Sequence, residues 1–251
     1  MAQSYGKAGN HVKNIGKRKI YIKYIFILIS IIVSYIFYKI YITIPSTNFY
    51  LKTVKNVFGA FSIGSLLSIF IPLFDDKLDI KIKNAFNGAK GEQEIAELLE
   101  ALPDEYVVFN NIFYENRKID HIVIGPTGVY LIETISSRGK VEIKNDKILI
   151  NGYQYKTLGR MFSNVFWLKN FLGVDFVKGI VVFTKAFVPL DSEIKNIMIV
   201  NKKYLVDKII NEKQYMDKDT IEYLKNKVLI LIRVSKVFFS SNYTCKTLNI
   251  Y

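Results

Sequence analysis

An uninterrupted apolar run near the N-terminus limits what this chain can fold into. Residues 24–44, YIFILISIIVSYIFYKIYITI, contain one charged side chain, Lys39. As a helix with a rise of 1.5 Å per residue, the run would extend about 31 Å, close to the thickness of a bilayer core. Lys39 lies near its end, where a lysine side chain can reach the polar interface. No small-residue cleavage site follows, so the run predicts a membrane-spanning helix rather than a signal peptide.

A second apolar run covers residues 57–74, which carry no charge. As a helix it would extend about 27 Å, near the lower limit for crossing a bilayer. Gly59, Gly64 and Pro72 weaken the pattern, so a re-entrant or buried core helix is the alternative. We favour a second span.

The positive charge of the chain is concentrated in this region. The net charge is +13, but residues 1–74 hold nine Lys and Arg and no acidic residue, which leaves +4 for residues 75–251. This distribution weakens a nucleic-acid interpretation of the charge as a whole. Six basic residues precede the first run and only Lys52 and Lys55 separate the two, so the positive-inside rule places the N-terminus in the cytoplasm. Two spans predict a multi-pass protein of the cell membrane whose soluble domain is cytoplasmic.

The rest of the chain predicts a linker, a globular domain and a C-terminal extension. The expected divisions are a basic N-terminus (1–23), two spans (24–44 and 57–74), a polar linker (75–87), a domain (88–200) and C-terminal helices with a tail (201–251). Strands are expected over 106–113, 118–124, 129–135, 178–184 and 197–200, with a hairpin over 141–150. The tail, which includes VLILIRVSKVFF, predicts another strand or an interfacial segment. A single cysteine, Cys245, excludes an internal disulfide.

Glu92 has an unusual position in the helix expected before Pro103. It precedes Ile95 by three residues and Leu99 by seven, which places it on the side of the helix that faces the core. A carboxylate favoured by the dipole at the start of a helix is one explanation, and a functional carboxylate is the other.

The turn GPTG, residues 125–128, sets the pairing of the strands on either side of it. With Gly125 opposite Gly128, Asp120 lies opposite Glu133, and like charges in such a pair are destabilising unless they are neutralised. A divalent cation would neutralise them, and oxygen-only ligands suit a hard ion such as magnesium. The alternative is that one acid is solvated at the strand end or pairs with Arg117 or Lys118.

Together these segments resemble a known family. GAKGEQEIAELLEALP, RKIDHIVIGPTGVYLIET and the glycine at 139 are similar to the NERD (nuclease-related) domain, a branch of the PD-(D/E)xK nuclease superfamily, from about Gly88 to Thr184. The resemblance implies an α/β fold with a central mixed sheet flanked by helices. It also implies that Glu92, Asp120 and Glu133 form an acidic cluster that holds Mg²⁺ (or Mn²⁺).

The sequence departs from the family at two positions. The lysine of the family's E-x-K motif is Ile135 here, and the glutamine of the following helix is Arg160. Lys118 shares the strand face of Asp120, so its ammonium is a candidate substitute for the missing lysine. His121 points to the opposite face by strand alternation, and we expect it to be packed rather than catalytic.

Two functions remain open from the sequence. The first is a membrane-anchored, metal-dependent phosphodiesterase that acts on DNA or RNA, with Glu92, Asp120, Glu133 and Lys118 as its site residues. The second is a catalytically inactive pseudonuclease that binds nucleic acid or a protein partner at the membrane. The retained acids favour the first, and Ile135 favours the second.

Overall fold

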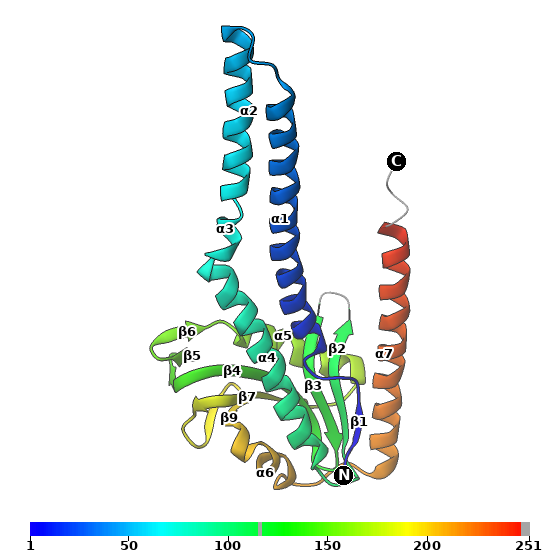
Figure 1. Ribbon diagram of the computed structural model, residues 1–251. Coiled ribbons are helices and arrows are strands. Elements are labelled where there is room, and N and C mark those ends of the chain that lie inside the picture. The colour runs from blue at the N-terminus through cyan, green and yellow to red at the C-terminus, as the bar shows by residue number, and fades with distance from the viewer. Residues whose placement is uncertain (115–116, 247–251) are drawn as a thin grey trace. The chain divides into compact units, whose positions relative to one another are not determined.

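The fold is known from a computed structural model that describes residues 1–114 and 117–246, with side chains to residue 235 (Figure 1). The chain divides into two units. One contains residues 12–86, and the other combines residues 1–11 with residues 87–251. The first eleven residues therefore belong with the C-terminal domain and not with the helices that follow them.

Residues 12–86 form a helical hairpin. It contains most of α1 (Asn10–Thr43), followed by α2 (Phe49–Leu67), α3 (Phe70–Leu73) and the first turns of α4 (Asp76–Glu100). Ser34 and Ser62 hold α1 against α2, since the hydroxyl of each donates to the carbonyl of the other, at 2.8 and 3.0 Å. Small residues at such a contact let two helices approach closely.

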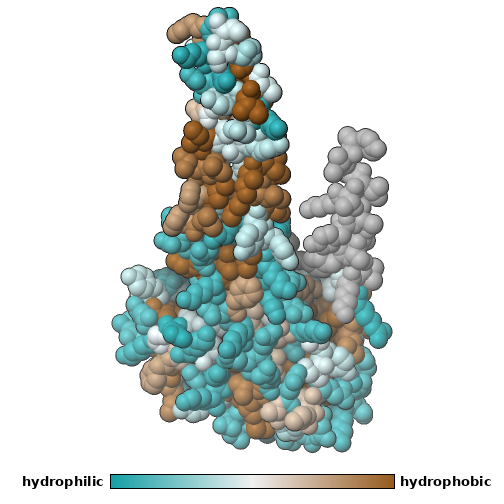
Figure 2. Space-filling view, viewed as in Figure 1, coloured by the Kyte–Doolittle hydropathy of each residue, from teal (hydrophilic) through white to brown (hydrophobic). Residues whose placement is uncertain are grey.

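The apolar helices have the dimensions of membrane spans. Two helical stretches, one in α1 and one beginning with α2, are long and apolar enough by length and composition to cross a bilayer. Aliphatic and aromatic side chains cover most of their surface (Figure 2). The helix bounds differ from the expected 57–74, because α2 begins at Phe49, where the Asn48 side chain accepts a hydrogen bond from the backbone of Leu51, and ends at Leu67.

The expected linker 75–87 is helical. It forms the first turns of α4, which runs without a break from Asp76 to Glu100. Glu92 therefore lies well inside a helix, and the explanation of this acid as a favourable charge at a helix start is wrong. Its predicted orientation toward the core is confirmed, since Glu92 is buried.

The domain is built on a mixed nine-stranded sheet. The strand order is β1-β2-β3-β4-β7-β9-β8, with β5 and β6 forming an arm on the end of β4. Neighbours pair antiparallel from β2 to β4 and parallel from β4 through β7 to β9. The strands are β1 (Gln3–Tyr5), β2 (Val107–Tyr114), β3 (Arg117–Gly125), β4 (Gly128–Lys144), β5 (Lys147–Ile150), β6 (Tyr153–Tyr155), β7 (Lys178–Phe187), β8 (Ser192–Ile194) and β9 (Ile197–Asn201).

Helices cover both faces of the sheet. One core contains Ile95 and Leu99 of α4 and Leu205 and Ile209 of α6 (Leu205–Ile210). The other core contains apolar side chains of α5 (Leu158–Leu172) and α7 (Lys218–Lys246). A short 3₁₀ turn, Lys202–Tyr204, precedes α6. The expected fold class, a central mixed sheet flanked by helices and preceded by two apolar helices, is confirmed.

Of the two alternatives for the tail, the strand is wrong through residue 246, and the interfacial segment stays a prediction. Residues 218–246 form the single helix α7, so the helical pattern expected over 218–228 continues much further. Residues 247–251 of the expected tail lie outside the described chain.

Candidate functional site

The candidate site lies where β3 and β4 separate. Their pairing runs from Gly125↔Gly128 to His121↔Ile132, which confirms the register predicted from the GPTG turn up to that point, whereas the predicted pair Asp120↔Glu133 does not form because the strands separate there. Beyond this point β3 pairs only with β2, through Ile112↔Ile119, and β4 pairs with β7, through Glu133↔Val181. The backbone N–H of Thr134 is thereby left without a partner on β3, and it donates instead to Oδ2 of Asp120 at 3.0 Å.

Three buried carboxylates, each carried by a different element, lie near this strand separation. Glu92 comes from α4, Asp120 from β3 and Glu133 from β4, and each side chain belongs to a residue only 4 or 5 % exposed. Carboxylates this deeply buried require a charged or hydrogen-bonded partner. The family resemblance implied one cluster of three acids; the contacts join Glu92 and Asp120 through one lysine, while Glu133 pairs with a different cation.

Lys118 joins two of the carboxylates. Its Nζ lies 2.6 Å from Oε1 of Glu92 and 2.6 Å from Oδ1 of Asp120. Burial alone would lower the pKa of Lys118, but the charges of Asp120 and Glu92 and their hydrogen bonds raise it above the ordinary value. Burial and the charge of Asp120 raise the pKa of Glu92, against the opposing effects of Lys118 and of the Gly9 backbone N–H. The ammonium is therefore held charged between two acids.

Glu133 has a different partner. Its Oε1 pairs with the guanidinium of Arg160 on α5. Arg160 is the residue that replaces the family's glutamine, and its side chain is 59 % exposed while Glu133 is buried. Ile135, which replaces the motif lysine, is 2 % exposed, pairs with Phe183 of β7 and belongs to the hydrophobic core.

A chain of hydrogen bonds continues from this site through the buried His121. The Nδ2 of Asn110 donates to Oγ of Ser4, so its Oδ1 accepts from Nδ1–H of His121 at 2.7 Å. The other ring nitrogen then accepts the hydroxyl proton of Thr134 at 3.3 Å. Burial lowers the pKa of His121 to about 4. The histidine is packed and neutral, as expected from its strand position.

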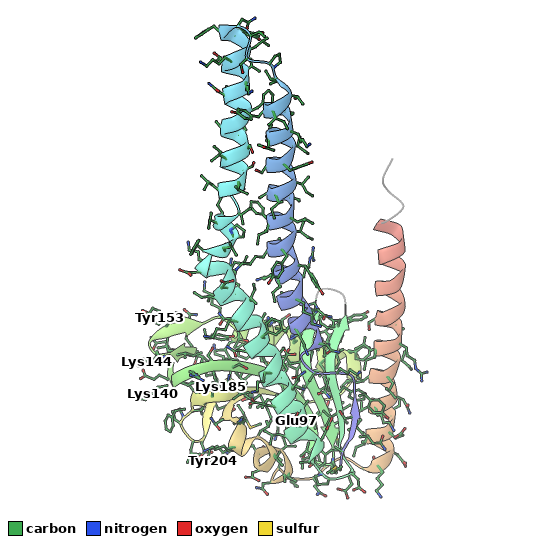
Figure 3. All side chains as sticks on the ribbon, in the orientation of Figure 1. Glu97, Lys140, Lys144, Tyr153, Lys185 and Tyr204 are labelled. Carbon is green, nitrogen blue, oxygen red and sulfur yellow. The ribbon has the colours of Figure 1, made fainter. Side chains whose placement is uncertain are left out.

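The arm of β5 and β6 borders the site. Tyr155 of β6 pairs with Ile148 of β5, and burial followed by the charge of Asp120 raises the pKa of its phenol. Figure 3 labels other side chains of this region, Lys140 and Lys144 on β4 and Tyr153 on β6, which are all exposed.

The acids have the chemistry of a metal site but not its arrangement. Three carboxylates supply the oxygen ligands that a hard divalent cation prefers. Among the described residues, however, no group of three or more His, Cys, Asp or Glu side chains is arranged to hold a metal ion. Lys118 and Arg160 supply the positive charge instead, and both carry long side chains that can rotate away. The oxygen donors suit a hard divalent cation in their chemistry, but in this arrangement they are neutralised by Lys118 and Arg160.

Several contacts of the site could not be predicted from the sequence patterns. Gly9 donates its backbone N–H to Oε2 of Glu92 at 3.0 Å. The two residues are 83 positions apart, and no sequence pattern predicted this contact. The Arg160–Glu133 pair had one signal, the departure of Arg160 from the family pattern. Lys118 had been predicted to share the face of Asp120, and its contact with that side chain agrees.

A mixed sheet with helices on both faces and an acidic cluster at a strand separation is the architecture of a nuclease-like domain. Residues 87–184 match the family model of the nuclease-related domain, NERD. This part of the chain is therefore similar to nuclease-related domains. No match is found among curated proteins or among solved structures.

Proposed function

We propose that this protein is a membrane-anchored, Mg²⁺-dependent phosphodiesterase that acts on DNA or RNA. The observation that carries the proposal is the gathering of Glu92 and Asp120 around the ammonium of Lys118, 2.6 Å from each, at the strand separation of a nuclease-related domain. Acids and a lysine brought together at one buried site are the groups that metal-assisted phosphodiester hydrolysis uses.

Each residue has a role in this proposal. Glu92, Asp120 and Glu133 would hold Mg²⁺ or Mn²⁺, which when bound polarises the phosphodiester and activates water. The flexible side chain of Lys118 releases the acids and offsets negative charge that develops on the phosphate. Thr134 holds Asp120 in position through its backbone N–H.

Cleavage by the full chain in detergent tests the proposal. Single- and double-stranded DNA and RNA are incubated with Mg²⁺ or Mn²⁺ and with the parent, Asp120→Asn or Lys118→Ala. We expect the parent to cut and each variant to be slower by about a hundredfold or more, since positioned charged groups contribute on that scale. Lys140→Ala, which removes an exposed lysine of β4, is the matched control and retains the parent rate.

Two results would contradict the proposal. A parent that is inert on all four substrates would do so, as would an Asp120→Asn variant that cuts as fast as the parent. Because Lys118→Ala leaves two buried acids without their cation, its folding is followed by thermal unfolding with and without Mg²⁺. Replacing Ile135 by lysine is a poor restoring change, since it would bury an ammonium in the core.

A second candidate function is a pseudonuclease that binds nucleic acid or a protein partner without cutting. It is favoured by Ile135, which is a core residue, and by the neutralisation of every site carboxylate by Lys118 or Arg160. Substrate binding by an inert parent, measured by fluorescence anisotropy, would select this candidate.

The membrane arrangement is part of the proposal. We propose that α1 and α2 cross the membrane and that both ends of the chain are cytoplasmic. The pairing of β1 with β2 supports a common side for the N-terminus and the domain, because residues 3–5 cannot join the sheet from across a bilayer. The excess of basic residues before the apolar run that begins at residue 24 supports the cytoplasmic side.

A further inference from the structure

The first eleven residues, called here the N-terminal segment, are built into the domain although they lie outside the matched residues 87–184. Strand β1 adds in parallel to β2, from Gln3↔Val107 to Tyr5↔Phe109, and the rings of Tyr5 and Phe109 stack with centroids 5.3 Å apart. The backbone N–H of Ala2 donates to the carbonyl of Glu100 at the end of α4. The segment is thus tied to the sheet edge and to the helix that carries Glu92.

Two glycines let the segment lie this close. Gly6 and Gly9 have φ of +88° and +73°, a region that favours glycine. A Cβ at Gly6 would lie 2.2 Å from the carbonyl oxygen of Asn110, and one at Gly9 would lie 2.4 Å from that of Ala89. Both obstacles are backbone atoms, so no side-chain movement would relieve the overlap.

The first connection to the acidic cluster is direct. Gly9 donates its backbone N–H to Oε2 of Glu92 at 3.0 Å, while the other oxygen of that carboxylate accepts from Lys118. Hydrogen bonds to both oxygens fix the carboxylate in one orientation. If Lys118 moves away, the Gly9 contact still holds Glu92.

The second connection runs from the exposed Ser4 through the buried side chains of Asn110 and His121 to Thr134. Ser4 accepts a hydrogen bond from Asn110, which accepts one from His121, and His121 in turn accepts from Thr134. Thr134 holds Asp120 through its backbone N–H. The segment therefore reaches two of the three carboxylates by separate routes, one through α4 and one through β2, β3 and β4.

We infer that the N-terminal segment is a working part of the acidic site, with Gly9 and Ser4 as positioning residues that hold Glu92 and Asp120 ready for a divalent cation. The inference rests on the proposed function, because it takes the acidic cluster as the working site. It also makes the site depend on chain that lies immediately before the first apolar helix. A domain cut out at residue 87 would lack both connections.

The test uses the full chain in detergent and two variants. Gly9→Ala forces a side chain against the backbone of Ala89, and Ser4→Ala removes one hydroxyl without adding atoms. Gly64→Ala is the matched glycine control, since a Cβ there meets nothing within 4 Å. Exposure of each carboxylate is measured by carbodiimide labelling and mass spectrometry, with Glu97 on the exposed side of α4 as the internal reference (Figure 3). Mg²⁺ affinity is measured by titration calorimetry.

We expect Gly9→Ala to raise the labelling of Glu92 relative to Glu97, and to weaken Mg²⁺ binding, by about tenfold each, because it removes a hydrogen bond to a charged group. Ser4→Ala should raise the labelling of Asp120 by about threefold, since one neutral hydrogen bond is lost at a distance from that acid. Gly64→Ala should match the parent in both measurements.

Unchanged labelling of Glu92 in Gly9→Ala and of Asp120 in Ser4→Ala would overturn the inference. If Gly9→Ala fails to fold, as shown by its unfolding curve, the Ser4→Ala result decides alone. Labelling needs neither metal nor substrate. A parent that neither binds Mg²⁺ nor cuts would therefore overturn the proposed function, while labelling would still decide whether the segment positions the acids.

Discussion

At the scale of single residues, the site places a charged lysine, Lys118, close to a histidine, His121, that must stay neutral. Lys118 lies between two acids, and His121, the neighbour of Asp120 in sequence, is fully buried and hydrogen-bonded on both ring nitrogens. Strand alternation separates the two environments, because side chains at consecutive positions point to opposite faces. A protonated His121 would carry a hydrogen on both ring nitrogens. Its Nε2 could then no longer accept the hydrogen bond that the Thr134 hydroxyl donates.

His121 makes stability depend on pH. Burial lowers its pKa in the folded protein to about 4 from 6.5, so the unfolded chain takes up the proton first as the pH falls. This contribution is fully present above pH 6.5 and is lost toward pH 4. Between pH 7 and pH 5 the parent should lose about 2 kcal/mol more than His121→Gln. Urea unfolding followed by the fluorescence of Trp167, the single tryptophan, measures the difference. Equal losses would show that His121 does not titrate in this way.

At the scale of elements, the turn between β3 and β4 decides which residues meet at the site. Gly125 and Gly128 close the hairpin, and Gly128 has φ of +128°. Gly125 also faces a buried ring, since a Cβ there would lie 2.1 Å from Cδ1 of Tyr106. The Tyr106 hydroxyl is hydrogen-bonded to Thr127 in the same turn, 3.0 Å away, so the ring has little room to move.

Gly125→Ala should therefore destabilise the domain. We expect a loss of about 1–3 kcal/mol, because the added methyl group overpacks a rigid contact. Gly159→Ala is the control: it lies in α5, where a Cβ meets nothing within 4 Å, and it should be neutral or stabilising by about 0.5–1 kcal/mol. Urea unfolding of both variants gives the comparison. A loss in Gly125→Ala no larger than in Gly159→Ala would contradict the packing argument.

The elements also show how far the sequence could predict the site. The turn chemistry at 125–128 and the two-residue period of strands predicted the register that brings Asp120 toward β4, and helical spacing predicted the inward side of Glu92. The β1–β2 pairing could not be predicted from the sequence, because it joins residues about a hundred positions apart. Strand β1 also has only three residues, too few to show a periodic pattern. The helix over 75–87 was missed because its polar residues resemble a linker.

At the scale of the whole molecule, the proposed membrane arrangement requires the N-terminal segment and the domain to lie on one side of the bilayer. Strand β1 pairs with β2, and the helices that follow residue 11 return the chain to the domain at residue 87. An even number of crossings satisfies this requirement, and an odd number would draw β1 out of the sheet. In the proposed arrangement the two apolar helices α1 and α2 would supply two crossings, with residues 44–48 between them.

Cysteine labelling of intact cells tests this topology and its orientation. In a Cys245→Ser background, single cysteines are placed by Ser46→Cys in the connection between α1 and α2 and by Lys195→Cys, whose side chain is 65 % exposed on the domain. A membrane-impermeant maleimide should label the first from outside and the second only after permeabilisation, because the basic residues before residue 24 favour a cytoplasmic N-terminus. The reverse pattern would invert the orientation while leaving two crossings intact. Labelling of both cysteines only after permeabilisation, with a permeant maleimide showing both to be reactive, would mean that the hairpin does not cross the bilayer, and the membrane-spanning proposal would fall.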